Sequence, residues 1–526
     1  MLRLSSRPRI RLLVAAGLAA VSTGLAQQAL AVNQLQLRYR VLRRSTTVTD
    51  ETAAQLRQLE ESALAARGRG QAGLAFRDLG RAVALLEGKP WTAEDEYLQS
   101  LTVATDSTVC DPGRPLIARL TQLYPAARGR LKISARATLA PATAGPRAGA
   151  RRERGDARVL GEFALLPVDL IFTPLRLAAD LGAVADGAYE LAVEVRDEGR
   201  VLRRVTAPVF VVRGLDAARE KLEPRLAKIP GREQVKASIR YPFDFARLLN
   251  LGEIDPAPYD FAAGLAQAEK LLSSLEAGGD PFAGERGNLA RHYLFAEAGE
   301  IMPYRVYVPK SYDGSTAVPL IVALHGLGGT ETTFMQQGNG TLPRLAEQHG
   351  LIVVTPLGYR RNGGYGRGGP GPLGAPDPLT ARMLQRSEKD VLNVLAEVRR
   401  DYRIDGTRMY LMGHSMGGNG TWTLGSRHAQ LWAALGPIAG GSSTPEAVPL
   451  ARLKEQGVPV ICVHGDADRT AHVEGSRAMI AELKRLGVPH EYHEIPGGTH
   501  GDVVGPNLPR LVEFFLRHRR STPALP

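Results

Sequence analysis

The residues of this chain best suited to chemistry lie in the run 413–417, which reads Gly-His-Ser-Met-Gly. The run follows a β-like segment at 408–412 and precedes a helix-like segment from Gly418 to about Trp432. A serine between two glycines at a strand-to-helix turn is typical of a strained, exposed nucleophile, because glycine permits the tight backbone turn. We therefore predict that Ser415 is a catalytic nucleophile. An inert Gly-Ser turn is the alternative.

An activated serine needs a base that takes its proton and a carboxylate that orients the base. The apolar run 458–463 is typical of a strand buried on both faces, and it leads to Asp466 and Asp468. A second strand-like run, 490–495, leads into a glycine-rich loop that contains His500. Both groups follow the carboxyl end of a strand, where open parallel sheets place their sites. These positions predict His500 as the base and one of the two aspartates as the acid.

The serine turn and the order serine, acid, histidine resemble the α/β-hydrolase family of serine esterases. The resemblance is closest to its secreted group of polyhydroxybutyrate depolymerase-like and feruloyl esterase-like enzymes, and covers roughly residues 290–520. Family members often carry His-Gly-x-x-Asp with the last aspartate in the triad, and residues 464–468 read His-Gly-Asp-Ala-Asp. The resemblance therefore implies Asp468 as the acid. It leaves Asp466 as a turn-capping residue or a neighbouring hydrogen-bonding group.

Such a site also needs two backbone N–H donors for the negative charge that develops on the substrate oxygen. One is expected from Met416, the residue after the nucleophile. The strand-like run 319–324 ends in His-Gly-Leu-Gly-Gly at 325–329, which resembles the His-Gly-x-Gly loop of the family. The resemblance implies Leu327 as the second donor of this oxyanion hole, and a simple glycine-rich chain reversal is the alternative. The implied mechanism is acyl transfer through an acyl-enzyme on Ser415.

The second half of the chain alternates β-like and helix-like segments. This alternation predicts an α/β fold with a mostly parallel sheet that helices cover on both faces. Two β-like runs within 291–309 meet at a turn at 298–300, which resembles the opening antiparallel hairpin of an α/β-hydrolase. We therefore expect an α/β-hydrolase fold for the catalytic domain.

The first half predicts accessory regions. Apolar residues recur at helical spacings over 48–125, whereas apolar and polar residues alternate from Tyr189 to Arg196 and a second strand returns over 201–212. These patterns predict a helical segment followed by a small β-sandwich-like domain. The expected division is a signal peptide at 1–31, a helical region at 32–128, a β-sandwich-like domain at 129–214, a helical bridge at 215–285 and the catalytic domain at 286–520.

The N-terminus is typical of a targeting segment. Four arginines precede an apolar stretch at 12–25, which is too short to span a bilayer comfortably, and residues 29–31 read Ala-Leu-Ala, a cleavage pattern. We predict a secreted or periplasmic protein with no permanent membrane anchor after cleavage. A retained anchor is the alternative.

Composition and motifs limit the partners and cofactors that we expect for this chain. The 526 residues carry a net charge of +12, but the basic residues are spread along the chain and no nucleic-acid-binding motif accompanies them, so we expect no nucleic-acid partner. The two cysteines, Cys110 and Cys462, are predicted to be free thiols. No metal-ligand spacing, phosphate loop or dinucleotide motif stands out, so we expect neither a metal nor a cofactor.

Specificity is expected from a loop at 358–377 that is rich in Gly, Pro and Arg. We predict that Tyr365 binds substrate by stacking, with a flexible solvent loop as the alternative. The leading hypothesis is a carboxylic ester hydrolase acting on an ester-bearing small molecule or polymer. The alternatives are a serine peptidase of the prolyl oligopeptidase type and an inactive protein that binds a surface.

Overall fold

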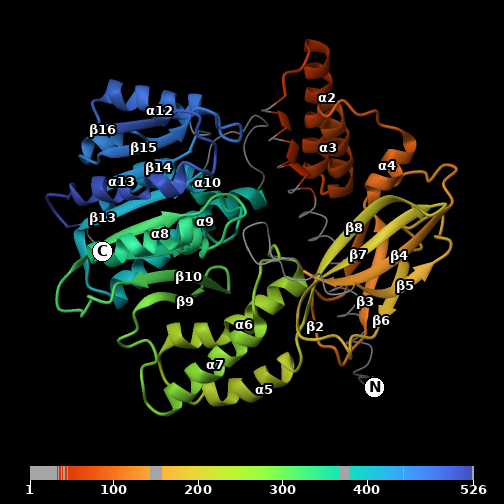
Figure 1. Cartoon of the computed structure of the whole chain (residues 1–526), viewed down its shortest axis with the longest axis horizontal. Helices are drawn as coiled ribbons and strands as arrows, with labels where there is room; N and C mark the ends of the chain where they lie inside the picture. Colours follow the sequence, from red (N-terminus) through yellow and green to blue (C-terminus); the bar gives the residue numbers. More distant parts are fainter. Residues whose placement is uncertain are drawn as a thin grey trace, which may run out of the picture. The chain divides into compact units, whose positions relative to one another are not determined.

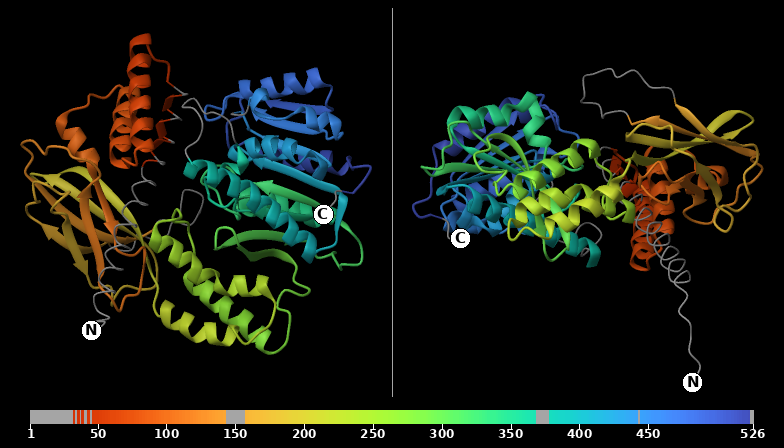
Figure 2. Two further views of the ribbon diagram at one scale, coloured as in Figure 1. Left: turned by 180° about the vertical axis from the view of Figure 1, so that it is seen from behind. Right: turned by 90° about the horizontal axis from the view of Figure 1, so that it is seen from below.

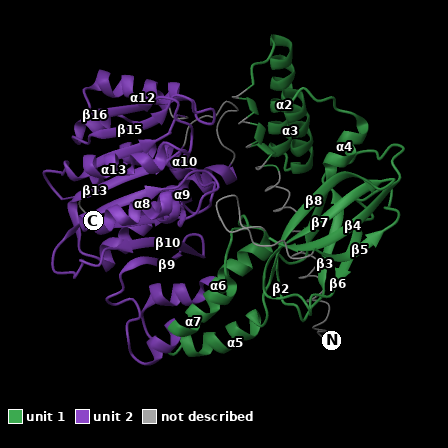
Figure 3. Ribbon diagram, in the orientation of Figure 1, with its two compact units in different colours: residues 1–228, 242–270 green, residues 229–241, 271–526 purple. Residues whose placement is uncertain are grey.

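The computed structural model describes residues 46–142, 157–367, 378–441 and 444–523, together with residues 32, 35, 36, 38, 39, 42 and 43. The chain divides into two compact units (Figure 3), one of residues 1–228 and 242–270 and one of residues 229–241 and 271–526. The predicted signal peptide at 1–31 lies outside the described residues, as does part of the expected specificity loop, 368–377.

The first unit contains a pair of helices, α2 (Asp50–Gly68) and α3 (Ala72–Leu86). The hydroxyl of Thr49 accepts a hydrogen bond from the N–H of Thr52 at 3.2 Å, which satisfies one of the free donors at the start of α2. The apolar faces of the two helices form one core, which includes Leu56, Phe76, Leu79 and Val83. The short α4 (Ala93–Ser100) follows and begins with a capping box.

Two β-sheets complete this part of the unit. One sheet has the order β1 (Leu101–Thr105), β3 (Leu116–Gln122), β6 (Leu175–Ala179). The other has the order β2 (Val109–Cys110), β8 (Arg200–Val211), β7 (Gly187–Asp197), β4 (Ile133–Pro141), β5 (Arg158–Phe163). Buried side chains from both sheets form one shared core, which is the sandwich-like arrangement expected from the sequence.

The prediction of a helical region up to residue 128 is wrong beyond Ser100. Leu101 pairs with Gln122 at one end of an antiparallel ladder between β1 and β3. Burial alternates at every second residue in both strands, which is the period of a strand and not of a helix. The β-sandwich therefore begins at residue 101 and not at 129.

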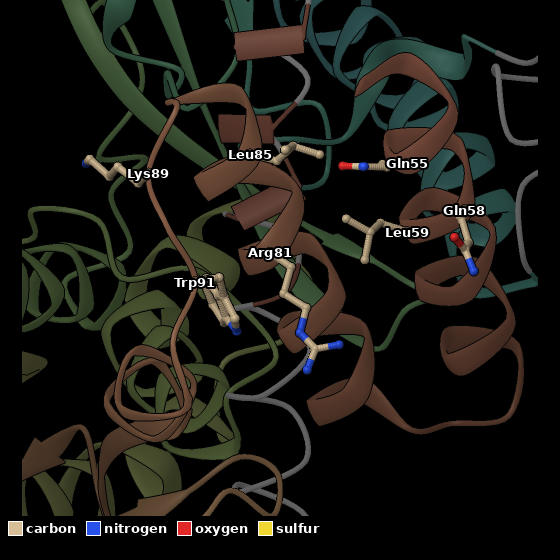
Figure 4. Close-up of a pocket in the computed structure, with 7 residues that line it drawn as sticks. All are labelled: Gln55, Gln58, Leu59, Arg81, Leu85, Lys89 and Trp91. Carbon is tan, nitrogen blue, oxygen red and sulfur yellow. The ribbon is translucent and has the colours of Figure 1, made fainter. Parts of the chain in front are cut away.

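A pocket of about 340 Å³ opens between α2, α3 and the segment after α3 (Figure 4). Its cationic side chains are already paired, since Arg81 contacts Glu96, and Lys89 lies 2.7 Å from Glu87. The pocket thus offers little uncompensated charge to an ionic ligand. The lining residues are Gln55, Gln58, Leu59, Arg81, Leu85, Lys89 and Trp91.

Three helices follow the sandwich along the chain: α5 (Leu215–Leu226), α6 (Glu233–Leu251) and α7 (Phe261–Glu276). The boundary between the two units crosses α6 and α7. Within the first unit, the Asn250 amide bonds to both backbone groups of Val109. Within the second unit, Gln234 Nε2 donates to the Tyr304 hydroxyl at 2.6 Å. Each end of α6 is therefore tied to its own unit.

The second unit is built on an eight-stranded sheet. Its order is β16 (His490–Ile495), β15 (Val460–Gly465), β14 (Ala434–Ile438), β13 (Ile404–His414), β11 (Val318–Leu324), β12 (Ile352–Pro356), β10 (Glu300–Val308), β9 (Gly287–Phe295). Strands β9 and β10 form an antiparallel hairpin, and β10 also pairs antiparallel with β12. Every other pairing in the sheet is parallel, as the sequence predicted.

Helices cover both faces of this sheet (Figures 1 and 2). Along β11, Leu320, Val322 and Leu324 enter a core with side chains of α9 (Pro378–Asp401), α10 (Met416–Arg427) and α12 (Val473–Leu486). The intervening Ile321 and Ala323 enter a second core with α8 (Thr333–His349) and α13 (Val504–Leu516). A mostly parallel sheet with two covered faces and an antiparallel opening hairpin is the α/β-hydrolase fold expected from the sequence.

The cysteines, the hydropathy of the helices and the clusters of metal-binding side chains can be described for both units. Cys110 and Cys462 are both free and buried. Within the described ranges, none of the helices combines the length and the apolar composition needed to cross a bilayer. Among the same residues, no cluster of three or more His, Cys, Asp or Glu side chains is arranged to hold a metal ion.

Candidate active site

Ser415 stands alone between the end of β13 and the start of α10, in the conformation of a sharp turn. Its φ is 57° and its ψ is −113°, a combination that L-residues rarely adopt. Its N–H donates to Ile438 O of the neighbouring β14 at 2.9 Å, which ties the turn to the sheet. Strain of this kind persists only where the surrounding structure enforces it, and it is concentrated at functional sites.

Two glycines make this turn possible. A Cβ atom on Gly417 would lie 2.0 Å from Leu324 O, and one on Gly413 would lie 2.4 Å from Gly417 O. Both distances are far inside van der Waals contact, and both obstructing atoms belong to the backbone. The glycine spacing seen in the sequence is therefore required by close approach of β11, β13 and α10.

Ser415, His500 and Asp468 form a continuous hydrogen-bonded row. His500 Nδ1 lies 2.6 Å from Asp468 Oδ2, and His500 Nε2 lies 2.8 Å from Ser415 Oγ. A carboxylate can only accept, so Nδ1 carries the hydrogen and Nε2 presents its lone pair to the serine hydroxyl. The serine is thus placed to give its proton to the histidine.

Asp468 accepts four hydrogen bonds in a buried position. Its Oδ1 accepts from the N–H groups of Thr470 at 2.8 Å and Ala471 at 2.9 Å, while His500 and His464 approach Oδ2. Burial alone would raise the pKa of Asp468, but the hydrogen bonds from His464, His500 and the Ala471 N–H prevail and hold it well below its ordinary value. The carboxylate therefore stays charged.

His464, the first residue of the 464–468 run, supports this carboxylate. Its side chain is 0% exposed, and its Nε2 lies 2.7 Å from Ala471 O and 3.2 Å from Asp468 Oδ2. Both oxygens are acceptors, so Nε2 carries the hydrogen and Nδ1 accepts from the Ser476 hydroxyl at 2.7 Å. His464 is a residue that holds the acid in place.

The two aspartates of the 464–468 run have different surroundings. Asp466 Oδ1 accepts the N–H of Gly497 at 2.7 Å, and its own N–H donates to Ile495 O at 3.1 Å. Asp466 therefore braces the loop that carries His500 and is not hydrogen-bonded to the imidazole. His414 braces the same loop from the other side, with its Nε2 placed 2.7 Å from His500 O.

The loop after β11 lies against the nucleophile. A Cβ atom on Gly326 would stand 3.4 Å from Ser415 Cβ, so the residue before Leu327 approaches the serine closely. Among the described residues, the backbone hydrogen bonds of this turn use the N–H groups of Gly328 and Gly329 and not that of Leu327. Met416 is the first residue of α10, where an N–H has no acceptor one turn earlier. Met416 thus follows Ser415 directly, and Leu327 follows the glycine that approaches Ser415.

The structure corrects the expectation for Tyr365. Its side chain is 0% exposed and packs edge-on against His325, with ring centroids 5.6 Å apart. Gly420 of α10 lies so close that a Cβ there would be 2.7 Å from Tyr365 Cβ. The ring therefore fills the core between the specificity loop and α10 and is not open to stacking by a substrate. A lone aromatic in a glycine-rich segment gave no sign of this burial.

Comparisons with known proteins show similarity to esterases. A family model described as "Putative esterase" matches residues 296–502. Cutinase 2 of Thermobifida cellulosilytica is 31% identical over 207 residues, which cover 39% of this chain and 67% of the relative. The bifunctional acetylxylan esterase/xylanase XynS20E of Neocallimastix patriciarum is 29% identical over 33% of this chain. An S-formylglutathione hydrolase from Agrobacterium tumefaciens is similar in structure, with a TM-score of 0.37, 16% identity and coverage of 44% of this chain and 96% of that one.

The shared length varies widely among these relatives. This chain spans 22% of the length of the Neocallimastix enzyme and 16% of an uncharacterized secreted protein of Arthroderma benhamiae. The family model matches part of the second half of the chain, where the serine turn, the loop after β11 and His500 all lie. The chain belongs to the esterase family of the α/β-hydrolases.

Proposed function

We propose that this chain is a secreted carboxylic ester hydrolase that forms an acyl-enzyme on Ser415, with His500 as the base and Asp468 as the acid. The single observation that carries the proposal is the row of hydrogen bonds from Ser415 Oγ through His500 to Asp468, with lengths of 2.8 and 2.6 Å. Those lengths suit proton transfer and a charge-assisted hydrogen bond to the acid.

The proposed reaction follows from this geometry. Ser415 Oγ attacks the ester carbonyl while its proton passes to His500 Nε2, and Asp468 stabilises the imidazolium that forms. The N–H groups of Leu327 and Met416 receive the developing oxyanion. His500 then protonates the departing alcohol, which leaves the acyl group on Ser415. A water molecule gives a proton to His500 and attacks the acyl carbonyl. The tetrahedral intermediate then collapses, His500 returns the proton to Ser415 Oγ, and the carboxylic acid product leaves.

The substrate class is an ester-bearing small molecule or polymer. Relatives named as a cutinase and as a bifunctional acetylxylan esterase/xylanase support this class. The peptidase alternative gains no support from the first unit, whose described strands form two sheets around one core and not the repeated blades of a propeller. Secretion rests on the N-terminal sequence pattern alone.

Active-site labelling tests the proposal. Residues 32–526 are treated with a fluorophosphonate, and the adduct is located by intact mass and peptide mapping, with Ser415→Ala as the control. One adduct at Ser415 that is absent from the variant is the expected result. A folded wild-type protein that forms no adduct would refute the proposal.

A parallel assay addresses the bond that is cleaved. We expect hydrolysis of p-nitrophenyl esters at least 100-fold faster, in kcat/KM, than that of peptide anilides. A preference for the anilides would instead favour a peptidase.

A further inference from the structure

Gly328, the residue after the proposed donor Leu327, is bonded on both of its backbone groups by the segment after β12. Its N–H donates to Arg361 O and to Asn362 Oδ1, both at 3.1 Å. Its carbonyl oxygen accepts from the Arg361 guanidinium, with Nε at 3.0 Å and Nη2 also bonded. The φ of Gly328 is +73°, a left-handed conformation that these bonds hold in place.

These bonds connect to the Leu327 N–H through two peptide groups. The Gly328 carbonyl that accepts from Arg361 belongs to the same peptide group as the Gly329 N–H. That N–H donates to Gly326 O at 2.9 Å, and Gly326 O belongs to the same peptide group as the Leu327 N–H. Because each peptide group is planar, an arginine bonded to the first fixes the direction in which the second presents its N–H.

The Arg361 guanidinium also places a positive charge at one end of these two hydrogen-bonded peptide groups. It is permanently positive, and hydrogen-bonded peptide groups in series polarise one another. A cation on the Gly328 oxygen therefore makes the Gly329 N–H a stronger donor to Gly326 O, which in turn strengthens the Leu327 N–H. Both effects favour the oxyanion that forms in the transition state over the neutral carbonyl of the bound substrate.

The segment that carries Arg361 is itself firmly held. The buried Asp390 accepts the N–H groups of Gly358 at 2.7 Å and Tyr359 at 3.0 Å. Arg360 forms a 2.7 Å ion pair with Glu300, and the side chains of the pair are 15% and 5% exposed. A rigid support of this kind is what the positioning of a catalytic donor requires.

We infer that Arg361 and Asn362 are positioning residues that fix the Leu327 N–H in the oxyanion hole. The inference rests on the proposed function. Arg361 acts through the Gly328–Gly329 and Gly326–Leu327 peptide groups, and Asn362 locks Gly328 from its N–H side. In this role the Arg361 guanidinium binds the backbone of the site and does not contact the substrate.

Kinetics of four variants test the inference, with Arg403→Met as the matched control. Arg403 also donates to a backbone carbonyl, Ser315 O at 2.6 Å, but it precedes β13 at the end opposite Ser415. Arg361→Met should lower kcat/KM for a p-nitrophenyl ester about 10- to 100-fold, mainly through kcat, because loss of one such donor costs about 10²- to 10³-fold. Arg361→Lys should recover part of the loss, and Arg403→Met should leave the kinetics unchanged.

A boronic acid that forms a tetrahedral adduct on Ser415 supplies a second readout. Its affinity should fall by the same factor as kcat/KM, whereas KM stays within about twofold, because only the tetrahedral state uses the donor. Asn362→Leu should lose about 10-fold in kcat, and Asn362→Asp, which keeps an acceptor for the Gly328 N–H, should lie closer to wild type. This second pair decides the matter if Arg361→Met does not fold.

Three results would overturn the inference. They are wild-type kcat in folded Arg361→Met or Asn362→Leu, an effect confined to KM, or unchanged boronic acid affinity. A wild-type chain that neither labels with fluorophosphonate nor hydrolyses any ester would instead refute the proposed function, and this inference with it. An active wild-type enzyme with unaffected variants would refute this inference alone.

Discussion

His464 Nε2 lies 3.2 Å from Asp468 Oδ2, the same oxygen that accepts the 2.6 Å hydrogen bond from His500. The acid of the proposed triad is thus held between two imidazoles, of which one is buried and bonded to Ser476 and Ala471. This arrangement makes His464 a support of the charged carboxylate. It also means that the pattern His-Gly-x-x-Asp carries two functional side chains and not one.

Replacing His464 with leucine should weaken both activity and acid stability. The Ser476 hydroxyl and Ala471 carbonyl would lose a buried partner, which costs about 2–3 kcal/mol in free energy of unfolding. The kcat should fall about 10-fold because Asp468 is less well oriented.

The pH dependence of stability separates this role from simple packing. The folded pKa of Asp468 lies below its unfolded value, so its contribution is present above about pH 4 and is lost as pH falls through the folded pKa. In His464→Leu this contribution shrinks, so unfolding free energies measured from pH 2 to 6 should rise less steeply than in wild type. Ser476→Ala, which leaves Asp468 untouched, should keep the wild-type slope, and equal slopes in all three proteins would contradict the role.

The two aspartates of the 464–468 run should respond differently to the same change. Asp468→Asn is expected to lower kcat about 10³- to 10⁴-fold, since an amide favours the wrong histidine tautomer. Asp466→Asn keeps an oxygen for the Gly497 N–H and should stay within about threefold of wild type. Steady-state ester hydrolysis measures both, and a reversed ranking would assign the acid to Asp466.

Asp390 should make the protein less stable as pH rises from about 4 to 6. Burial raises the pKa of Asp390 to about 6, against the hydrogen bonds from Tyr293 and from the Tyr359 and Gly358 N–H groups that lower it. The folded state therefore binds a proton that the unfolded state releases near pH 4, and unfolding free energy falls by roughly 2–3 kcal/mol across this range. Urea unfolding of wild type and Asp390→Asn at several pH values measures this effect. The difference between their free energies of unfolding should change by this amount from about pH 4 to 6, and a constant difference would exclude the effect.

The sequence was most informative where a residue type has one physical use. Glycines at 413 and 417 flank a serine at a strand end, and the structure shows backbone atoms filling the space where side chains would stand. The parallel sheet was predictable for a similar reason, because the strand at 460–465 opens with four apolar residues in succession, 460–463, which must be covered on both faces.

Elsewhere the sequence carried less information. Leucines and valines at 101–122 fit helical spacing loosely, yet burial that alternates along β1 and β3 puts them in a sheet, and tertiary pairing decides between the two. The parts of the site that were missed, namely His414, Arg361 and Asn362, act through backbone groups. A hydrogen bond between a side chain and a distant backbone group leaves no pattern in a single sequence.

Tyr365→Ala should lower the stability of the protein and leave its ester specificity unchanged. Removing a fully buried ring should cost about 3–5 kcal/mol in free energy of unfolding, through lost burial and the cavity left behind. At temperatures where the variant stays folded, the rank order of KM values among ester substrates should not change. Differential scanning calorimetry with a panel of esters checks both statements, and an unaltered melting temperature with reordered KM values would restore the substrate-binding role.

The serine turn should tolerate no side chain at position 417, whereas position 501, also a glycine of the site, should tolerate one. In Gly417→Ala the new Cβ would meet Leu324 O at 2.0 Å, so either β11 or α10 must move, at a cost of about 3 kcal/mol or more. Because that movement displaces Ser415 and the loop after β11 together, fluorophosphonate labelling should be lost even in protein that remains folded. Gly501→Ala, beside His500, places its Cβ in open space and should label at the wild-type rate, within about twofold. Labelling rates and circular dichroism are measured for both variants. Normal labelling of Gly417→Ala would show that the turn can accommodate a Cβ atom at position 417, contrary to the structure.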